Sequence, residues 1–318
     1  MQDRVWVGSA AMPGPTHYRR RINRQDQVFY VRYGKWIVGA IADGCSAARL
    51  SEVGAGNLVH AAVQILMQSV FEGLPMDKVP DFFSAMMKKF LYSKIAAFPF
   101  GKQYLQRLGR STEPAFWFLP KATKAPPANL HADAFMYLAI EELYQATLLA
   151  GLVHEDEGGI ILVRGDGRVS VDGAVTVFDY NNMPPYFAYD FALDQYPGPA
   201  EDLQVKTVRV PAGFSRAAFT SDGWNWDLTQ THPFGLWNLS AFESWLLDQN
   251  NSRAQAKPTK PNLTPEEAWQ LYRPEEVNNL ARRLVKNPIT PSGVVLVTDD
   301  LSGIFVEREV FNDNGASR

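Results

Sequence analysis

Short runs of apolar and β-branched residues in the first fifty positions predict strands. The run RVWVGSA (residues 4–10) is a candidate strand. The run QVFYVRYGKWIVGAIAD (27–43) is typical of two strands joined at Tyr33-Gly34-Lys35, because a glycine between two β-rich runs indicates a hairpin. The N-terminal part of the chain is therefore expected to be β-structure.

A helical pattern begins at Ser51, a residue type that can cap a helix. Apolar residues then recur on one face, at Val59, Ala62, Val63, Leu66, Met67 and Val70. Further helices are predicted at 81–98, 133–145 and 264–285. The Pro/Ala-rich run 119–131 is expected to be a loop.

Strand-like runs return after residue 145. They are ATLLAGLV (146–153), GGIILV (158–163), RVSV (168–171), VKTVRV (205–210), RAAFT (216–220), GVVLVT (293–298) and GIFVERE (303–309). The order of strands, helices, strands, helix and strands lacks the regular strand–helix alternation of a parallel sheet. It predicts an α+β fold in which helices cover antiparallel sheets.

Composition narrows the class of protein. The chain has 318 residues, of which 46% are hydrophobic and 20% charged, and its net charge is −3. These values are typical of a soluble globular protein and lack the strongly basic footprint of a nucleic-acid binder. The single cysteine, Cys45, excludes an internal disulfide and favours a reducing compartment. With neither a signal peptide nor about 18 consecutive apolar residues, we expect a cytoplasmic protein without membrane partners.

Four aspartates flank the apolar runs. Asp43, Asp222 and Asp299 follow such runs directly, and Asp26 precedes one. Carboxylates that converge repel each other unless they are protonated or bind a metal, and oxygen ligands suit Mg²⁺ or Mn²⁺. Each aspartate alone is also a common turn or cap residue, so the interpretation depends on the set. The five histidines show no zinc-like spacing.

Six short motifs occur in order along the chain. They are RINRQD (21–26), AIADG (40–44), ATLLAGLV (146–153), ILVRGDGRVSV (161–171), FTSDGWNWD (219–227) and TDDLSGIFV (298–306). In this order they resemble the metal-dependent protein phosphatases of type 2C. The resemblance implies one phosphatase-like domain over residues 1–318, with insertions at about 76–131 and 228–262. It also implies a four-layer α/β/β/α sandwich of two antiparallel sheets flanked by helices.

The resemblance further implies a site that binds two Mg²⁺ or Mn²⁺ ions, with a looser third. Asp43 would bridge the two ions, the Gly44 carbonyl would bind one of them, and Asp222 and Asp299 would hold the other. Asp26 and its predecessor would hold metal-bound waters, Asp166 would help hold the third ion, and Arg21 would bind the phosphate. The implied activity is hydrolysis of phosphoserine and phosphothreonine in proteins by a water that two metals activate. The implied partners are phosphorylated proteins, including a Ser/Thr kinase or its targets.

Some positions depart from the family pattern. Gln25 is neutral, Cys45 stands where many animal members have a histidine, and Gly167 stands where serine is usual. The familiar Thr-x-Asp-His is not visible in 178–191. These departures leave an alternative open, namely a catalytically weak or inactive phosphatase-fold module that regulates or binds a partner.

Single residues also have simpler interpretations. Asp166-Gly167 is a hairpin signal, and Arg21 belongs to a basic triplet that would also suit a solvated surface. A cysteine-nucleophile phosphatase is disfavoured, because Arg49 lies only four residues after Cys45 and no histidine precedes it. Four tryptophans are expected to pack in the core or a flap: Trp224, Trp226, Trp237 and Trp245.

Overall fold

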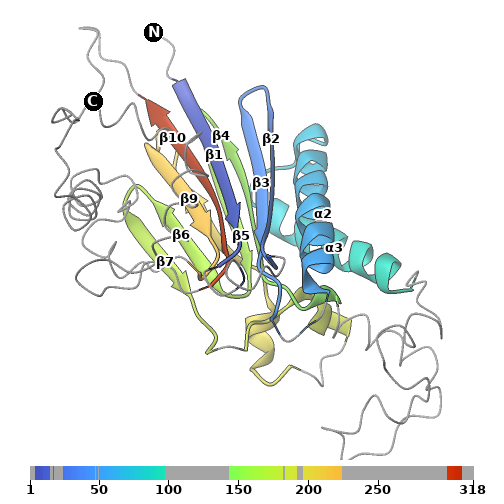
Figure 1. Cartoon of the computed structure of the whole chain (residues 1–318). Helices are drawn as coiled ribbons and strands as arrows, with labels where there is room; N and C mark the ends of the chain where they lie inside the picture. Colours follow the sequence, from blue (N-terminus) through green and yellow to red (C-terminus); the bar gives the residue numbers. More distant parts are fainter. Residues whose placement is uncertain are drawn as a thin grey trace, which may run out of the picture.

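The computed structural model describes residues 4–14, 17, 24–46, 48, 50–96, 143–181, 183–191, 196–223 and 299–309. Within them, ten strands form two antiparallel sheets (Figure 1). The strands are β1 (Arg4–Met12), β2 (Gln27–Tyr33), β3 (Trp36–Ala42), β4 (Leu148–His154), β5 (Gly158–Arg164), β6 (Gly167–Val171), β7 (Ala174–Phe178), β8 (Lys206–Val210), β9 (Arg216–Thr220) and β10 (Leu301–Glu309). One sheet has the order β1-β10-β9-β6-β7 and the other the order β2-β3-β4-β5-β8.

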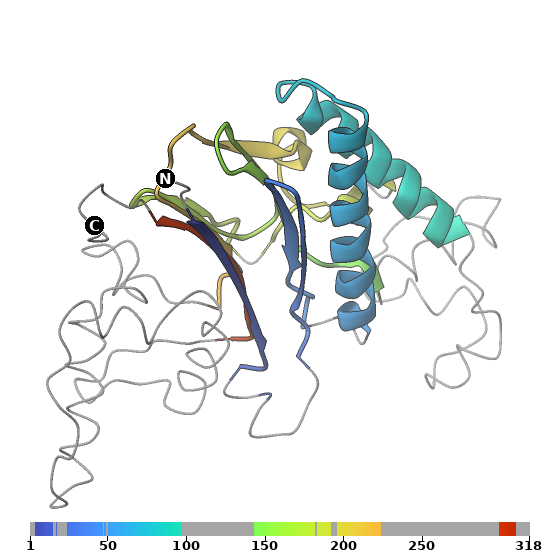
Figure 2. The same ribbon diagram turned by 90° about the horizontal axis from the view of Figure 1, so that it is seen from above.

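Two long helices cover one sheet. Helix α2 (Ser51–Phe71) and helix α3 (Val79–Ala96) lie on the outer face of the sheet that contains β2, β3 and β4 (Figure 2). Two short 3-10 helices, η3 (Phe187–Phe191) and η5 (Ala200–Leu203), lie in the connection between β7 and β8. None of the described helices is long and apolar enough to cross a membrane.

The predicted α+β sandwich of antiparallel sheets is confirmed, and the described residues supply three of its layers. The helix predicted at 264–285, the strand at 293–298, the loop at 119–131 and nearly all of the helix at 133–145 lie outside the described residues. Within the expected insertion 76–131, the described part includes α3, which packs against α2.

Strand β3 is buried on both faces because its side chains alternate between two cores. Ile37 and Ile41 face the core between the sheets, whereas Val38, Ala40 and Ala42 face the helices. This is the period of two expected for a strand. The sheet of β2 to β5 is therefore the central layer of the described structure.

Two glycines let the sheets approach closely. Gly39 and Gly151 are paired across β3 and β4. A Cβ on Gly39 would lie 2.5 Å from Ile304 Cδ1, and one on Gly151 would lie 2.8 Å from Phe219 Cε1. Both neighbours belong to the opposite sheet, so the space of the two missing side chains is filled by β9 and β10.

Of the two hairpins predicted from glycine-containing turns, the structure contains one. The hairpin at Gly34 is confirmed, with a φ of 57° at that glycine. The Asp166-Gly167 hairpin is wrong, because β5 and β6 belong to different sheets and the turn crosses between them. A second Asp-Gly, Asp172-Gly173, forms a hairpin between β6 and β7, with positive φ at both residues.

The predicted cap of α2 is also wrong. The N-cap residue is Leu50, and no side chain caps the helix. Ser51 is the first helical residue, and its hydroxyl accepts a hydrogen bond from Gln25 Nε2 at 3.0 Å. The serine therefore anchors an incoming segment and leaves the helix end without a side-chain cap.

Candidate metal centre

Strand register brings the four aspartates to one end of the sandwich. Gln27 pairs with Ala42, so Asp26 and Asp43 continue the β2–β3 ladder side by side. Thr220 pairs with Gly303, so Asp222 and Asp299 lie just beyond the β9–β10 ladder. One sheet thus supplies Asp26 and Asp43, and the other supplies Asp222 and Asp299.

Asp26 is the innermost of these carboxylates. It is completely buried, and no hydrogen bond of ordinary geometry reaches either carboxylate oxygen from the described residues, although Asp43, Ser221 and Ser302 lie close enough to lower its pKa in part. Burial raises the pKa of Asp26 to about 7, and the charge of Asp300 adds to the shift. A buried carboxyl without such a bond is costly, and a bound cation would offset that cost.

Asp43 shares this environment. Burial raises its pKa well above the ordinary value, the charge of Asp26 adds to the rise, and Asp222 and Asp299 contribute further. Burial likewise raises the pKa of Asp299, with the charges of Asp300 and Asp222 adding to it. Asp222 and Asp299 are exposed, so the carboxylates extend from the interior to solvent.

Gly44 continues the chain past Asp43. The residues on either side of it form hydrogen bonds with the segment before β4. Cys45 N–H donates to the Gln145 carbonyl, and the Asp43 carbonyl accepts from Thr147 N–H, both at 2.8 Å. Neither bond uses the Gly44 carbonyl. A Cβ on Gly44 would lie 2.7 Å from Ser51 Oγ, so any larger residue would push against the start of α2.

Gln25, the departure next to Asp26, has a structural role. Its Nε2 donates to the Cys45 carbonyl at 3.1 Å and to Ser51 Oγ at 3.0 Å. Its backbone N–H donates to Asp300 Oδ2 at 2.6 Å. A glutamate could not donate to the carbonyl, so the amide ties together three segments that surround the site.

Asp166 lies on the crossing between the two sheets. Its Oδ1 accepts a hydrogen bond from the Tyr180 N–H at 2.8 Å, and burial raises its pKa to about 6, with the charge of Asp222 adding to the shift. Arg168 pairs with Thr220, so Asp166 and Asp222 both lie just beyond the same end of the β6–β9 ladder. The structure thus brings Asp166 to the edge of the same cluster.

Arg164, two residues earlier, fixes the surroundings of that crossing. Its buried guanidinium donates to the Pro185 carbonyl at 2.8 Å and to Asp190 Oδ1 at 2.7 Å, and it also donates to the Leu203 carbonyl. These bonds hold the β7–β8 connection against the end of β5. Sequence reasoning assigned no role to this arginine.

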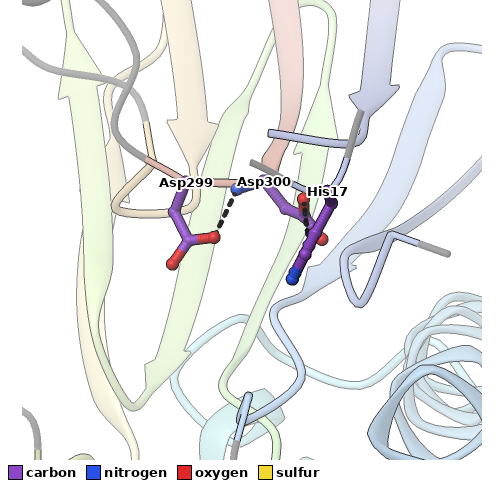
Figure 3. A group of neighbouring side chains, drawn as sticks. All are labelled: His17, Asp299 and Asp300. Carbon is purple, nitrogen blue, oxygen red and sulfur yellow. Dashed lines mark hydrogen bonds and ion pairs between the residues drawn. The ribbon is translucent and has the colours of Figure 1, made fainter. Parts of the chain in front are cut away.

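Asp300 and His17 were also missed (Figure 3). Asp300 is buried; its Oδ1 accepts from Gly14 N–H and lies 2.8 Å from His17 Nδ1, and its Oδ2 accepts from Gln25 N–H. Asp299 Oδ1 accepts from the backbone N–H of Asp300 at 2.8 Å. The sequence offered one signal for Asp300, a second carboxylate directly before the apolar strand.

The remaining predicted residues are not placed. Arg21, Trp224, Trp226, Trp237 and Trp245 lie outside the described residues. The carboxylates that the structure does bring together, with a completely buried carboxyl among them, match the oxygen ligands that Mg²⁺ and Mn²⁺ prefer. The residues present therefore fit a hard divalent cation.

Comparison with known proteins identifies the class. The family model for protein phosphatase 2C matches residues 13–258, which is most of the chain. The chain belongs to the protein phosphatase 2C family. No curated protein matches the sequence.

Solved structures give low similarity over nearly the whole chain. The photosystem II phosphatase PBCP is 13% identical, with 96% of this chain and 98% of that chain covered and a TM-score of 0.45. The serine/threonine phosphatase Stp1 from Staphylococcus aureus is 12% identical, with 96% and 95% covered and a TM-score of 0.44. A serine-threonine phosphatase 2C from Toxoplasma gondii is 12% identical, with 97% and 96% covered and a TM-score of 0.42.

Proposed function

We propose that this protein is a Mg²⁺- or Mn²⁺-dependent phosphatase that removes phosphate from phosphoserine and phosphothreonine in proteins. The observation that carries the proposal is the convergence of Asp26, Asp43, Asp222 and Asp299 at one end of the two sheets, with Asp26 completely buried. Membership of the protein phosphatase 2C family supports the reaction class.

Each group has an assigned role in this proposal. Asp43 would hold both ions, the Gly44 carbonyl would hold one of them, and Asp222 and Asp299 would hold the other. Asp26 would orient water, and Asp166 would serve a third ion. When bound, two such ions lower the pKa of a shared water and offset charge on the phosphate. Arg21 would bind the phosphate, since a guanidinium matches two phosphate oxygens at once.

Other residues of the site would hold its segments in position. Gln25 keeps the Cys45 loop and the start of α2 in position through its amide, which holds the segment after Asp43 against the segment before β2. We assign protonation of the leaving oxygen to solvent water, because Cys45 occupies the position after Asp43-Gly44. No covalent intermediate with the protein is required.

The proposal also covers the domain organisation, the cellular compartment and the substrates. We propose that residues 1–318 form one domain, with α3 belonging to the helical layer beside α2. The single cysteine supports a reducing compartment, and we propose the cytoplasm. The substrates would be phosphorylated proteins, among them a Ser/Thr kinase or its targets.

The first test is hydrolysis of p-nitrophenyl phosphate with and without millimolar Mn²⁺. We expect activity that requires Mn²⁺ and that falls by about 100-fold or more in Asp222→Asn, because a ligand of the activating ion is lost. Asp156→Asn is the matched control, since Asp156 is exposed and pairs with Lys35 far from the site. Phosphopeptides would follow.

The alternative is a regulatory module that has lost activity. It is favoured by one observation, the use of Gln25 as a structural tie where an acidic residue would face a metal-bound water. A folded, metal-loaded protein without activity would support this alternative and overturn the enzyme. In that case Asp43→Asn should leave partner binding unchanged.

A further inference from the structure

His17 is held by a buried carboxylate. Its Nδ1 lies 2.8 Å from Asp300 Oδ1, and its side chain is only 17% exposed. Asp300 also accepts hydrogen bonds from the backbone N–H groups of Gly14 and Gln25, so its carboxylate cannot rotate freely. The orientation of the imidazole is therefore fixed.

This contact leaves Nε2 as the ring atom with an available lone pair. When Nδ1–H donates to a carboxylate, the neutral imidazole presents Nε2 as an acceptor or ligand. Nε2 has no hydrogen bond to the described part of the chain. Histidines that bind metals commonly have this arrangement, in which the second nitrogen donates to a carboxylate.

A second carboxylate lies beside the His17 imidazole. His17, Asp299 and Asp300 each offer one ligand atom, and these atoms lie within 4.8 Å of one another. Asp299 comes from the segment just before β10 and His17 from the connection between β1 and β2, and both side chains point downward in Figure 3. Because Asp300 is already engaged by three donors, His17 and Asp299 are the groups available to an ion.

A second observation points to a cation nearby. Asp26 is completely buried, no hydrogen bond of ordinary geometry reaches its carboxylate from the described residues, and the charge of Asp300 acts on it. Asp299 and Asp222 add negative charge on the solvent side. This arrangement of charge favours an ion next to Asp299.

We propose that His17 is a nitrogen ligand of a divalent ion that Asp299 also binds, and that Asp300 is a positioning residue that orients its imidazole. The proposal rests on the metal centre of the proposed function and adds a ligand to an otherwise all-oxygen set. An imidazole ligand suits transition-metal ions, whereas Mg²⁺ prefers oxygen. The centre therefore selects Mn²⁺ over Mg²⁺.

The test is the electron spin-echo spectrum of Mn²⁺ bound to the intact protein. We expect modulation from a directly bound imidazole nitrogen in the wild type and its loss in His17→Gln. His154→Gln is the matched control and should keep the signal, because the His154 ring packs against Trp36 and accepts bonds from the Asp156 and Glu157 N–H groups.

Calorimetry provides a second readout that does not need activity. His17→Gln should raise the Kd for Mn²⁺ by about 10-fold or more and change the Kd for Mg²⁺ far less. Asp300→Asn should raise the Kd for Mn²⁺ by about 10- to 100-fold, as loss of an outer carboxylate typically does.

The outcomes separate this inference from the proposed function. Mn²⁺ that binds the wild type and is lost in Asp43→Asn, but shows no nitrogen modulation, would overturn the role of His17 and leave the metal centre standing. A wild type that binds no Mn²⁺ would overturn both. The wild-type spectrum alone shows whether a histidine nitrogen binds Mn²⁺. The inference can therefore be overturned even if a variant fails to fold.

Discussion

The environment of Asp26 and Asp43 follows from the register of the β2–β3 hairpin. One residue precedes β2 and the other follows β3, and the hairpin register sets them side by side. Burial then raises the pKa of both carboxyls, to about 7 for Asp26. Without metal, the pair retains protons that an unfolded chain would release near pH 4.

The metal-free protein should therefore lose stability as the pH rises. Between about pH 4 and pH 7 the unfolded state releases the Asp26 proton while the folded state keeps it, so unfolding becomes more favourable with rising pH. One pKa unit corresponds to about 1.4 kcal/mol, so Asp26 accounts for a few kcal/mol. The measurement is urea unfolding with a chelator at about pH 5 and about pH 7.5.

Asp26→Asn is the comparison for that measurement. The variant carries no titrating group at this position, so its free energy of unfolding should change less across the same pH range. Equal pH dependence in the variant and the wild type would show that Asp26 is not the source.

Some residues of the site were visible in the sequence and others were not. Asp43 and Asp222 follow apolar runs, and this local pattern was enough to single them out. Asp300 acts through Gly14, His17 and Gln25, which are 275 or more positions away in the chain. No local pattern specifies such contacts, so the roles of His17 and Asp300 emerged only from the fold.

At the scale of elements, two Asp-Gly dipeptides had opposite outcomes. Asp172-Gly173 closes a hairpin, whereas Asp166-Gly167 carries the chain from one sheet to the other. The dipeptide favours a turn in both cases, but the sheet that the next strand joins depends on β9, which pairs with β6. Strand β7 was missed for a related reason, since it is an edge strand whose residues are mostly exposed.

The close approach of the sheets gives a prediction at this scale. Gly39→Ala would place a Cβ 2.5 Å from Ile304 Cδ1 in the core between the sheets. We expect a loss of about 1–3 kcal/mol in the free energy of unfolding, typical of overpacking. Chemical denaturation measures the change.

Ile304→Val tests the cause of that loss. The substitution removes the methyl that the new Cβ would meet and alone should cost about 0.5–1.5 kcal/mol. In the double variant, part of the cost of Gly39→Ala should disappear, because the two sites share one contact. Strictly additive effects would contradict the packing argument.

For the whole molecule, the proposed metal centre depends on the packing of the two sheets. Asp26 and Asp43 belong to one sheet, and Asp222 and Asp299 extend from the other, so the full set exists only in the folded protein. Any ion bound by this set binds the native state in preference to the unfolded state, and its binding free energy stabilises the fold.

That coupling should itself depend on pH. At about pH 5.5 the metal-free centre holds a proton on Asp26, whose pKa is about 7, and holds one for part of the time on Asp166, whose pKa is about 6, while burial also raises the pKa of Asp43. Mn²⁺ must displace these protons, so its affinity should be lower at about pH 5.5 than at about pH 8. Thermal unfolding with a chelator or with millimolar Mn²⁺ at each pH measures the effect.

At about 100 times Kd, an ion contributes about 2.7 kcal/mol, which for a protein of this size raises Tm by roughly 4 °C. We expect this rise at about pH 8 and a much smaller one at about pH 5.5. Asp43→Asn should show no rise at either pH, because it removes the carboxylate that both ions would share. A rise of equal size at both values would mean that Mn²⁺ binds elsewhere, since only a site built from these protonated carboxyls requires the difference.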